Sequence, residues 1–213
     1  LKQVDPKTLR VAIQGFGNVG YYAAKIISLE LGSKIVGVSN AINATVNPKG
    51  LDIEALKAYE DQKKGDLAGF SGGQDLLRDD LLTIDCDVLI PAALSHAITV
   101  NVAQKTNAKL VIEAANAPTT AEANAILHQK GVYIIPSILA NAGGVVASYF
   151  EWTQNLQQFY WEYEHTVEEL DKRMVKAFWE VADMAEAKHI CPRQAAYFIA
   201  LERVAAAALL RGF

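Results

Sequence analysis

The chain has 213 residues, which is enough for one large domain or two small ones. Hydrophobic residues make up 51% and charged residues 21%, so the chain can bury a sizeable core and is expected to be globular. A net charge of −4 without a basic run argues against nucleic acid or an anionic membrane surface as a partner. No apolar stretch is long enough to span a bilayer, and the two cysteines provide no disulfide framework, as fits a cytoplasmic protein.

A glycine-rich turn follows the first predicted strand, at 9–14, and opens the first predicted helix, at 18–31. It reads GFGNVG over residues 15–20 and matches the G-x-G-x-x-G pattern of dinucleotide-binding proteins. In that pattern Gly15 permits the tight turn, Gly17 lets the backbone approach the pyrophosphate, and Gly20 lets helix and strand pack closely. The new helix would also direct free N–H groups at the phosphates. We therefore predict a dinucleotide site here.

Strand-like and helix-like segments then alternate along the chain. We expect further strands at 34–39, 88–90, 109–113 and 132–135, and further helices at 53–63, 98–105 and 119–130. Residues 41–50 and 65–73 are expected to be irregular. This alternation predicts an α/β fold, a doubly wound, Rossmann-like and mainly parallel sheet.

No strand signal follows Leu139, and helices are expected at 141–157, at 166–188 and from Pro192 onward. The pairs Thr119 with Glu122 and Thr166 with Glu169 are predicted to be capping boxes. An apolar stripe in the second of these helices is interpreted as core packing; it consists of Val167, Leu170, Met174, Phe178 and Val181. We expect one dinucleotide-binding domain over 1–213, with the sheet in 1–138 and a helical C-terminal extension in 139–213.

Loops at the ends of three predicted strands are candidate cofactor contacts, because a dinucleotide binds at the carboxyl ends of parallel strands. Small residues at 91–93 would let the backbone approach a ribose or nicotinamide. Asn116 could hydrogen-bond an amide or a hydroxyl, and a third such loop spans 139–144. None of the four histidines pairs with another residue at metal-ligand spacing, so we predict no metal site.

Five segments carry a resemblance to a known family: GFGNVG at 15–20, NPKGLD at 47–52, DCDVLIPAAL at 85–94, EAANAPTT at 113–120 and LANAGGVVASYFEW at 139–152. They resemble the cofactor-binding domain of glutamate dehydrogenase, whose relatives also act on leucine, phenylalanine and valine. The resemblance covers essentially the whole chain. It implies that L-glutamate, water and NAD(P)+ give 2-oxoglutarate, ammonium and NAD(P)H. It also implies a homo-oligomer, a hexamer by analogy.

The resemblance also implies roles for single residues. The pyrophosphate would lie against Gly15, Phe16, Gly17, Asn18, Val19 and Gly20. The nicotinamide ribose and ring would lie along Ala92, Ala93, Asn116 and Asn141. Val145 and Ser148 match positions that touch the substrate side chain. A serine hydroxyl suits the γ-carboxylate of glutamate, whereas leucine-type relatives need an apolar surface there. The alternative for Ser148 is a hydrogen bond back to a helix carbonyl.

The cofactor is left open between NAD and NADP. Ser39 and Asn40 stand where many relatives have Ser-Asp. In those relatives the aspartate would accept a hydrogen bond from the 2′-hydroxyl of the adenosine ribose. Asn40 can bond a hydroxyl but does not repel a 2′-phosphate as a carboxylate would. No arginine is adjacent to hold such a phosphate. The sequence leans slightly away from strict use of NAD.

The catalytic lysines and aspartate of the family lie in an N-terminal domain with no counterpart here. Lys63 and Lys64 match no catalytic motif and are expected to be a solvated helix end. The chain begins with Leu1, so we expect a piece of a longer protein that binds cofactor but does not turn over. Two alternatives remain open. The first is a leucine, phenylalanine or valine dehydrogenase, and an apolar replacement of Ser148 would test it. The second is a dinucleotide-binding module without catalysis, and the coding sequence upstream would test it.

Overall fold

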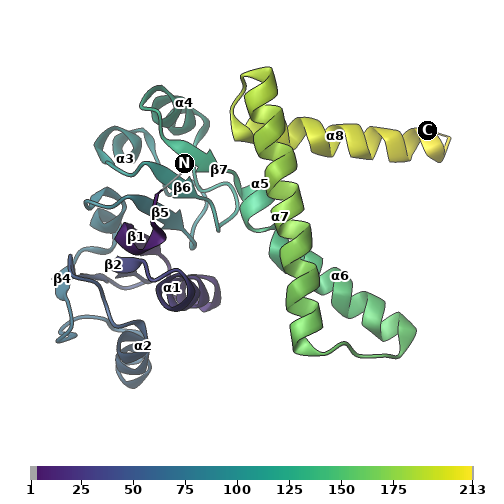
Figure 1. Ribbon diagram of the computed structural model, residues 1–213. Coiled ribbons are helices and arrows are strands. Elements are labelled where there is room, and N and C mark those ends of the chain that lie inside the picture. Colours follow the sequence, from purple (N-terminus) through teal and green to yellow (C-terminus); the bar gives the residue numbers. More distant parts are fainter. Residues whose placement is uncertain (1–3, 213) are drawn as a thin grey trace. The chain divides into compact units, whose positions relative to one another are not determined.

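The computed structural model describes residues 4–212 (Figure 1). They fall into two compact units that divide between Tyr133 and Ile134. This division lies close to the one expected at residue 139. The expectation that both units form one domain stays a prediction. Within the described part of the chain, no helix combines the length and the apolar character needed to cross a membrane.

A seven-stranded, mostly parallel sheet forms the framework of the first unit, in the order β4-β3-β2-β1-β5-β6-β7. Its strands are β1 Arg10–Gln14, β2 Lys34–Ser39, β3 Ala44–Val46, β4 Gln74–Leu76, β5 Val88–Pro91, β6 Leu110–Ile112 and β7 Tyr133–Ile135, the last of which spans the division. Parallel pairing joins β1 to β2 and to β5, and β5 to β6. The predicted α/β, Rossmann-like fold is confirmed.

Helices lie on both faces of this sheet, as a doubly wound fold requires. They are α1 Asn18–Glu30, α2 Ile53–Gln62, α3 Val100–Lys105 and α4 Ala121–Gln129, with 3₁₀ turns η1 Pro6–Thr8 and η2 Arg78–Thr83. Figure 1 shows α1 and α2 on one side of the strands and α3 and α4 on the other. Between them β1 is buried, with Ala12 and Ile13 fully inaccessible, which explains its continuous apolar run.

The sequence analysis missed two strands, one inside a segment expected to be irregular and one directly after such a segment. Strand β3 lies within 41–50 and pairs antiparallel with β2, while β4 follows the loop at 65–73 and pairs antiparallel with β3. Both strands have three residues, too few for a period-2 pattern to emerge from the sequence. These two strands extend the edge of the sheet beyond β2, although α2 lies between them in the chain.

Both predicted capping boxes are wrong in position. The N-cap of α4 is Thr120, whose hydroxyl accepts a hydrogen bond from the backbone N–H of Ala123, one residue later than expected. The long helix α7 begins at Tyr163 rather than at Thr166, and the Thr166 hydroxyl donates to the carbonyl of Glu162 instead. A threonine inside a helix often forms this back-bond, so the local pattern alone did not fix the helix start.

An ion-paired network ties β1 to the loop before β5. The backbone N–H and the guanidinium of Arg10 both donate to the Asp87 carboxylate, at 2.9 and 3.1 Å. The same guanidinium also reaches Asp85. Arg10 holds the pKa of Asp87 below its ordinary value. These contacts fix the strand that ends in the glycine loop.

The second unit is helical and comprises α5 Ser137–Ala140, α6 Ala142–Gln157, α7 Tyr163–Lys188 and α8 Pro192–Leu210. Helix α8 starts at Pro192 as predicted, and α5 was not predicted as a separate turn. The core of this unit joins buried residues of α5, α7 and α8: Leu139, Val181, Ala185, Ala195 and Ala196. The predicted apolar stripe of α7 is buried at Val181, whereas Val167 at its other end is 43% exposed.

Candidate functional site

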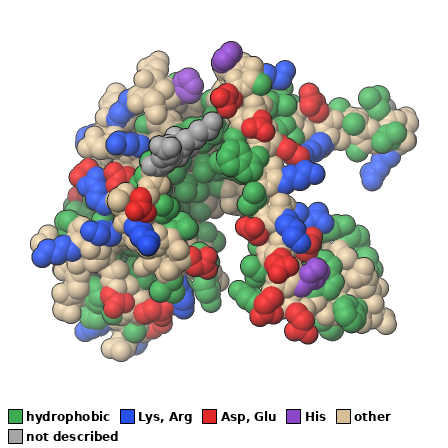
Figure 2. Space-filling view, in the orientation of Figure 1, with side chains coloured by type: hydrophobic (Ala, Val, Ile, Leu, Met, Phe, Trp, Pro, Cys, Tyr) green, Lys and Arg blue, Asp and Glu red, His purple; other side chains and the backbone are tan. Residues whose placement is uncertain are grey.

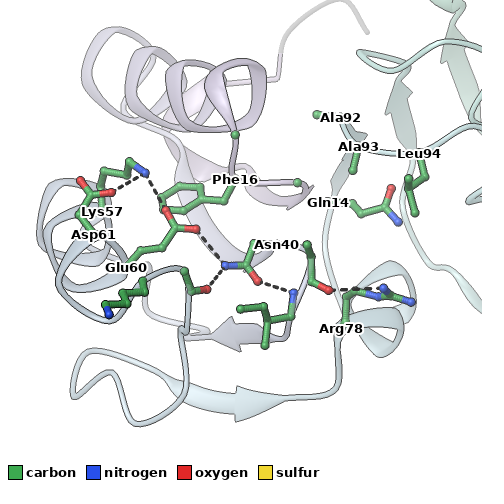
Figure 3. Close-up of a pocket in the computed structure, with 16 residues that line it drawn as sticks. Gln14, Phe16, Asn40, Lys57, Glu60, Asp61, Arg78, Ala92, Ala93 and Leu94 are labelled. Atoms are coloured by element: carbon green, nitrogen blue, oxygen red, sulfur yellow. Dashed lines mark hydrogen bonds and ion pairs between the residues drawn. The ribbon is translucent and has the colours of Figure 1, made fainter.

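A pocket of about 730 Å³ opens where β1, β2 and β5 end (Figure 3). Its walls come from the glycine loop, the turn after β2, the last turns of α2, the start of η2 and the turn after β5. The lining residues are Gln14, Gly15, Phe16, Gly17, Asn40, Ala41, Ile42, Lys57, Glu60, Asp61, Lys64, Gly65, Arg78, Ala92, Ala93 and Leu94. The pocket lies wholly within the first unit.

Three glycines shape the loop in different ways. Gly15 has a φ of +100°, a conformation that residues with a side chain rarely adopt. A Cβ added at Gly20 would lie 1.8 Å from the carbonyl oxygen of Gly15, so only glycine fits there. A Cβ added at Gly17 would meet no protein atom within 4 Å. Gly17 therefore leaves room for something outside the protein.

Helix α1 begins at this loop, with Gly17 as its N-cap. Asn18, Val19 and Gly20 form its first turn, and their N–H groups precede the first intrahelical hydrogen bond, from Tyr21 to the Gly17 carbonyl. The positive end of the helix dipole favours an anion at this place. Asn18, Val19 and Gly20 do not themselves line the pocket.

Phe16 contributes mainly to packing. Its ring is 2% exposed and lies 5.8 Å from the ring of Tyr21 in an edge-to-face arrangement. The Nζ of Lys57 lies 5.9 Å from the Phe16 ring centroid. The buried ring anchors the middle of the glycine loop to the core.

The end of β2 supplies Ser39 and Asn40. Ser39 is fully buried, and its hydroxyl finds no partner among the described residues. The Asn40 amide donates to the Glu60 carboxylate and to the Gly65 carbonyl, while its oxygen accepts from two backbone N–H groups of the following turn. Asn40 thus lines the pocket, but both its donors are committed within the protein. A ribose contact from its amide would require one of these bonds to be exchanged.

The α2 side of the pocket carries paired charges. The Lys57 ammonium lies 2.7 Å from the Glu60 carboxylate and 2.9 Å from that of Asp61. These two acceptors raise the pKa of Lys57. The Glu60 side chain is 10% exposed, so its carboxylate is largely removed from water and its charge is met by Lys57.

Two further basic residues line the pocket, and the sequence analysis missed both in this role. Lys64 follows the end of α2, where a solvated helix end was expected, and Arg78 opens η2. Figure 3 shows Arg78 reaching toward the turn after β2, where its Nη1 lies 3.5 Å from the Ala41 carbonyl oxygen. The arginine absent from the sequence around Asn40 is therefore supplied by η2, the 3₁₀ turn that follows β4.

The turn after β5 brings Ala92 and Ala93 to the pocket, opposite the glycine loop. The Ala92 N–H donates to the Gln14 carbonyl at 2.7 Å, which fixes this turn against β1. Asn116 follows β6 in the same unit but does not line the pocket, and its predicted contact with a cofactor stays a prediction.

The other three predicted residues belong to the second unit. Asn141 lies between α5 and α6, and Val145 on α6 is 74% exposed. The Ser148 hydroxyl donates to the Gly144 carbonyl at 3.0 Å, the back-bond considered as the alternative. This bond leaves the hydroxyl oxygen able to accept, so the substrate role of Ser148 stays a prediction.

The residues of the pocket fit a dinucleotide on two observations of the structure. Gly17 forms a cradle that a side chain would fill. Gln14 is 6% exposed, and its Oε1 is buried without a hydrogen-bond partner among the described residues. A buried acceptor without a partner costs about 1–3 kcal/mol, and a ligand donor could satisfy it. Gln14 was missed, although its place just before Gly15 at a strand end could have indicated it.

Among residues 4–212, no three His, Cys, Asp or Glu side chains are grouped so that they could hold a metal ion. His96 lies outside the pocket lining and has a φ of +54°, with its backbone N–H donating to the Ala117 carbonyl.

Comparison with known proteins places this site in a family. The family model for glutamate/leucine/phenylalanine/valine dehydrogenases matches residues 1–212. A glutamate dehydrogenase of Thermotoga maritima is 46% identical over 209 residues, which are 98% of this chain and 50% of that protein.

Solved structures agree with this result. The hetero-hexameric glutamate dehydrogenase of Thermus thermophilus, in a leucine-bound form, superposes with a TM-score of 0.92 at 32% identity, over 100% of this chain and 50% of that one. Glutamate dehydrogenase of Peptoniphilus asaccharolyticus gives a TM-score of 0.81 at 34% identity, over 97% of this chain and 48% of that one. The chain spans about half the length of these relatives. It belongs to the glutamate/leucine/phenylalanine/valine dehydrogenase family.

Proposed function

We propose that the first unit binds NAD(P) and that the chain is the cofactor-binding half of a glutamate dehydrogenase. The reaction converts L-glutamate, water and NAD(P)+ to 2-oxoglutarate, ammonium, NAD(P)H and a proton. The observation that supports this most is the pocket at the strand ends, which is lined by the open face of Gly17 and by Gln14, whose Oε1 has no partner among the described residues. When bound, the nicotinamide supplies the hydride acceptor.

Each side of the pocket has a distinct task in this proposal. The N–H groups at the start of α1 hold the pyrophosphate, next to the face that Gly17 leaves open. Ala92 and Ala93 allow close approach of the nicotinamide ribose. Gln14 accepts a hydrogen bond from a ribose hydroxyl or from the carboxamide, which removes the cost of its buried oxygen.

Glutamate is the substrate we propose for the longer protein. The relatives compared above are named glutamate dehydrogenases, and Ser148 offers a hydroxyl where a γ-carboxylate is expected. By analogy with the hexameric Thermus thermophilus protein, the longer protein is also proposed to be a hexamer. A cytoplasmic location stays a prediction.

Residues 1–213 alone are proposed to bind cofactor without turnover. Polarising the 2-oxo group and moving protons at the α-nitrogen need a lysine and a carboxylic acid beside the substrate. We assign no residue of this chain to either role. When residues 1–213 are mixed with L-glutamate and NAD+ or NADP+, the absorbance at 340 nm should therefore rise no faster than it does without protein. Reduction of either cofactor by the chain itself would disprove this part of the proposal.

Calorimetric titration of residues 1–213 with NAD+ and with NADP+ tests the site directly. The decisive variant is Gly17→Val, because a Cβ at this position meets no protein atom within 4 Å and the φ of −74° suits valine. We expect this variant to fold with a melting temperature within a few degrees of the parent and to lose at least about tenfold in affinity. Leu29→Val is the matched control, since Leu29 is 70% exposed near the other end of α1.

The outcomes separate clearly. Binding that Gly17→Val abolishes and Leu29→Val preserves supports the dinucleotide site. Binding that survives Gly17→Val in full would place the ligand elsewhere. Failure of the parent chain to bind either dinucleotide would reject the proposed cofactor site.

A further inference from the structure

We propose that Arg78 and Lys64 form a binding site for a phosphate on the 2′ position of the adenosine ribose, so that the pocket takes NADP(H) in preference to NAD(H). This inference rests on the proposed dinucleotide function and identifies the ligand class of that same pocket. In dinucleotide-binding folds, an acidic residue at the end of β2 binds the free 2′-hydroxyl of NAD, and a basic residue nearby accommodates the 2′-phosphate of NADP.

The turn after β2 offers no free carboxylate to a ribose diol. Asn40 stands at the end of the strand, and its amide donors are bound to Glu60 and Gly65. Two carboxylates contact this turn: that of Glu60 accepts from Asn40 at 2.9 Å and from Lys57 at 2.7 Å, and that of Asp66 accepts from Asn43 at 2.6 Å. Lys57 is shared between Glu60, which lines the pocket, and Asp61, so it offsets the Glu60 charge in part, and Glu60 opposes a phosphate less than a free acid would.

Arg78 reaches this turn because β3 pairs with β2 and β4 pairs with β3. Strand β3 pairs with β2 at Ser39 and Ala44, and β4 pairs with β3 at Ala44 and Leu76. Two residues after β4 the chain enters η2, which opens with Arg78. The Arg78 Nη1 lies 3.5 Å from the Ala41 carbonyl oxygen, at the outer limit of a hydrogen bond. The guanidinium thus borders the pocket and keeps N–H groups for another acceptor.

The existing partner of Arg78 would not prevent a phosphate from binding. Arg78 donates from Nε and Nη2 to the two carboxylate oxygens of its neighbour Asp79, at 2.7 and 3.2 Å. The Asp79 side chain is 73% exposed, so water and salt screen this pair and a phosphate can compete for the guanidinium. A phosphate monoester carries about −1.5 to −2 charges at pH 7, and a guanidinium can bind it with two parallel N–H bonds.

Lys64 adds a second cation on the α2 side of the same pocket. It follows the C-cap Lys63 and has a φ of +54°, so the chain turns sharply at this residue. Among the described residues, Lys64 forms no ion pair within 4.0 Å, in contrast to Lys57. Its ammonium is therefore available to an anionic ligand. The pocket lining thus holds two cations for a 2′-phosphate, the planar guanidinium of Arg78 from η2 and the flexible ammonium of Lys64 from the α2 side.

The test compares two probes that differ only in this phosphate, adenosine 2′,5′-bisphosphate and adenosine 5′-monophosphate, by calorimetry at low salt. We expect residues 1–213 to bind the bisphosphate at least about tenfold more tightly, with a preference that shrinks as salt rises. Arg78→Gln should reduce affinity for the bisphosphate about tenfold and leave the monophosphate within about twofold. Lys64→Gln should have the same selective effect at a smaller size, and Lys63→Gln, outside the pocket lining, should change neither.

Arg78 is exposed on a short 3₁₀ turn, so Arg78→Gln is expected to fold, and its melting temperature checks this. Equal affinity of the parent chain for the two probes, or an equal loss of both in Arg78→Gln, would overturn the inference while leaving dinucleotide binding intact. If neither probe, nor NAD+ or NADP+, binds, the proposed cofactor site itself fails and the inference falls with it.

Discussion

The two units of this chain are stabilised in different ways. The sheet unit buries complete side chains between its layers: Ile13, Leu56, Leu67 and Leu89 are all fully inaccessible. The helical unit has long helices with few buried positions. Helix α7 has 26 residues and buries Val181 and Ala185, while α8 buries Ala195 and Ala196.

The helical unit also exposes large apolar side chains. Figure 2 shows hydrophobic side chains along α8, where the exposed ones include Leu201, Val204, Leu209 and Leu210. A position in the sheet unit is thus determined by close neighbours on several sides, whereas many positions in the helices are determined only by local helix geometry. A substitution should therefore have a large effect in the first unit and a small one in the second.

Glycine positions test this difference most strongly. In Gly20→Ala the new Cβ would lie 1.8 Å from the oxygen and 2.7 Å from the carbonyl carbon of Gly15. Both are backbone atoms, so the loop must move, and we expect a loss of about 3 kcal/mol or more. In Gly144→Ala the Cβ meets no atom within 4 Å, and replacing a helix glycine should instead stabilise by about 0.5–1 kcal/mol.

Two probes can separate the units during urea unfolding. The three tryptophans, Trp152, Trp161 and Trp179, all lie in the second unit, so their emission reports on the helices. Amide hydrogen exchange in β1 and β2 reports on the sheet. Gly20→Ala should lower protection in the strands far more than it shifts the tryptophan transition. Equal effects of the two alanine substitutions would show that the contrast between the units is wrong.

The ion pairs of Arg10 provide a smaller effect with a defined pH dependence. Asp87→Asn should destabilise the first unit by about 1–2 kcal/mol at pH 7, less than a buried pair because Arg10 is 35% exposed. The folded pKa of Asp87 is lowered by Arg10, so its contribution is present above the unfolded value of about 3.9 and is lost as pH falls through the folded value. The difference between parent and variant should therefore stay constant from pH 7 to about 5 and shrink below about 4.

A neighbouring carboxylate serves as the control. Asp85 binds the same guanidinium, but its side chain is 70% exposed, compared with 23% for Asp87. Asp85→Asn should change stability by no more than about 0.5 kcal/mol. A loss as large as that of Asp87→Asn would mean that exposure does not set the strength of these contacts. Urea titrations at a series of pH values measure both.

The sequence predicted those parts of the fold in which a long pattern repeats. Helix α1, strand β2 and helix α2 lie within one residue of their expected bounds because periodicity and a glycine turn or an N-cap agree there. The short strands β3 and β4 were missed, and with them the path that brings Arg78 to Ala41. A contact that depends on unrecognised strand pairing cannot be inferred from residues adjacent in the sequence.

The same distinction applies to the pocket residues: roles that follow from a short motif could be predicted, and roles that depend on tertiary neighbours could not. The roles of Gly15 and Gly20 follow from a short motif, and the structure shows the steric reason for each. Asn40 was expected to be free for a ribose, but Glu60 and Gly65 occupy its amide from a different helix and loop. Which donors are already bound depends on tertiary neighbours, so the sequence could place Asn40 at the pocket without showing what its amide does.

The smallest expected effect lies in the helical unit, at the ion pair between Glu180 of α7 and Arg203 of α8. The Arg203 side chain is 64% exposed and that of Glu180 is 34% exposed, so water and salt screen the pair. The two helices are held together instead by the cluster that includes Val181, Ala185 and Ala195. Glu180→Gln should therefore shift the tryptophan-monitored urea transition by no more than about 0.5 kcal/mol, and added salt should remove the difference. A loss above about 1 kcal/mol that persists in high salt would mean that polar contacts, rather than the small apolar core, hold the helical unit together.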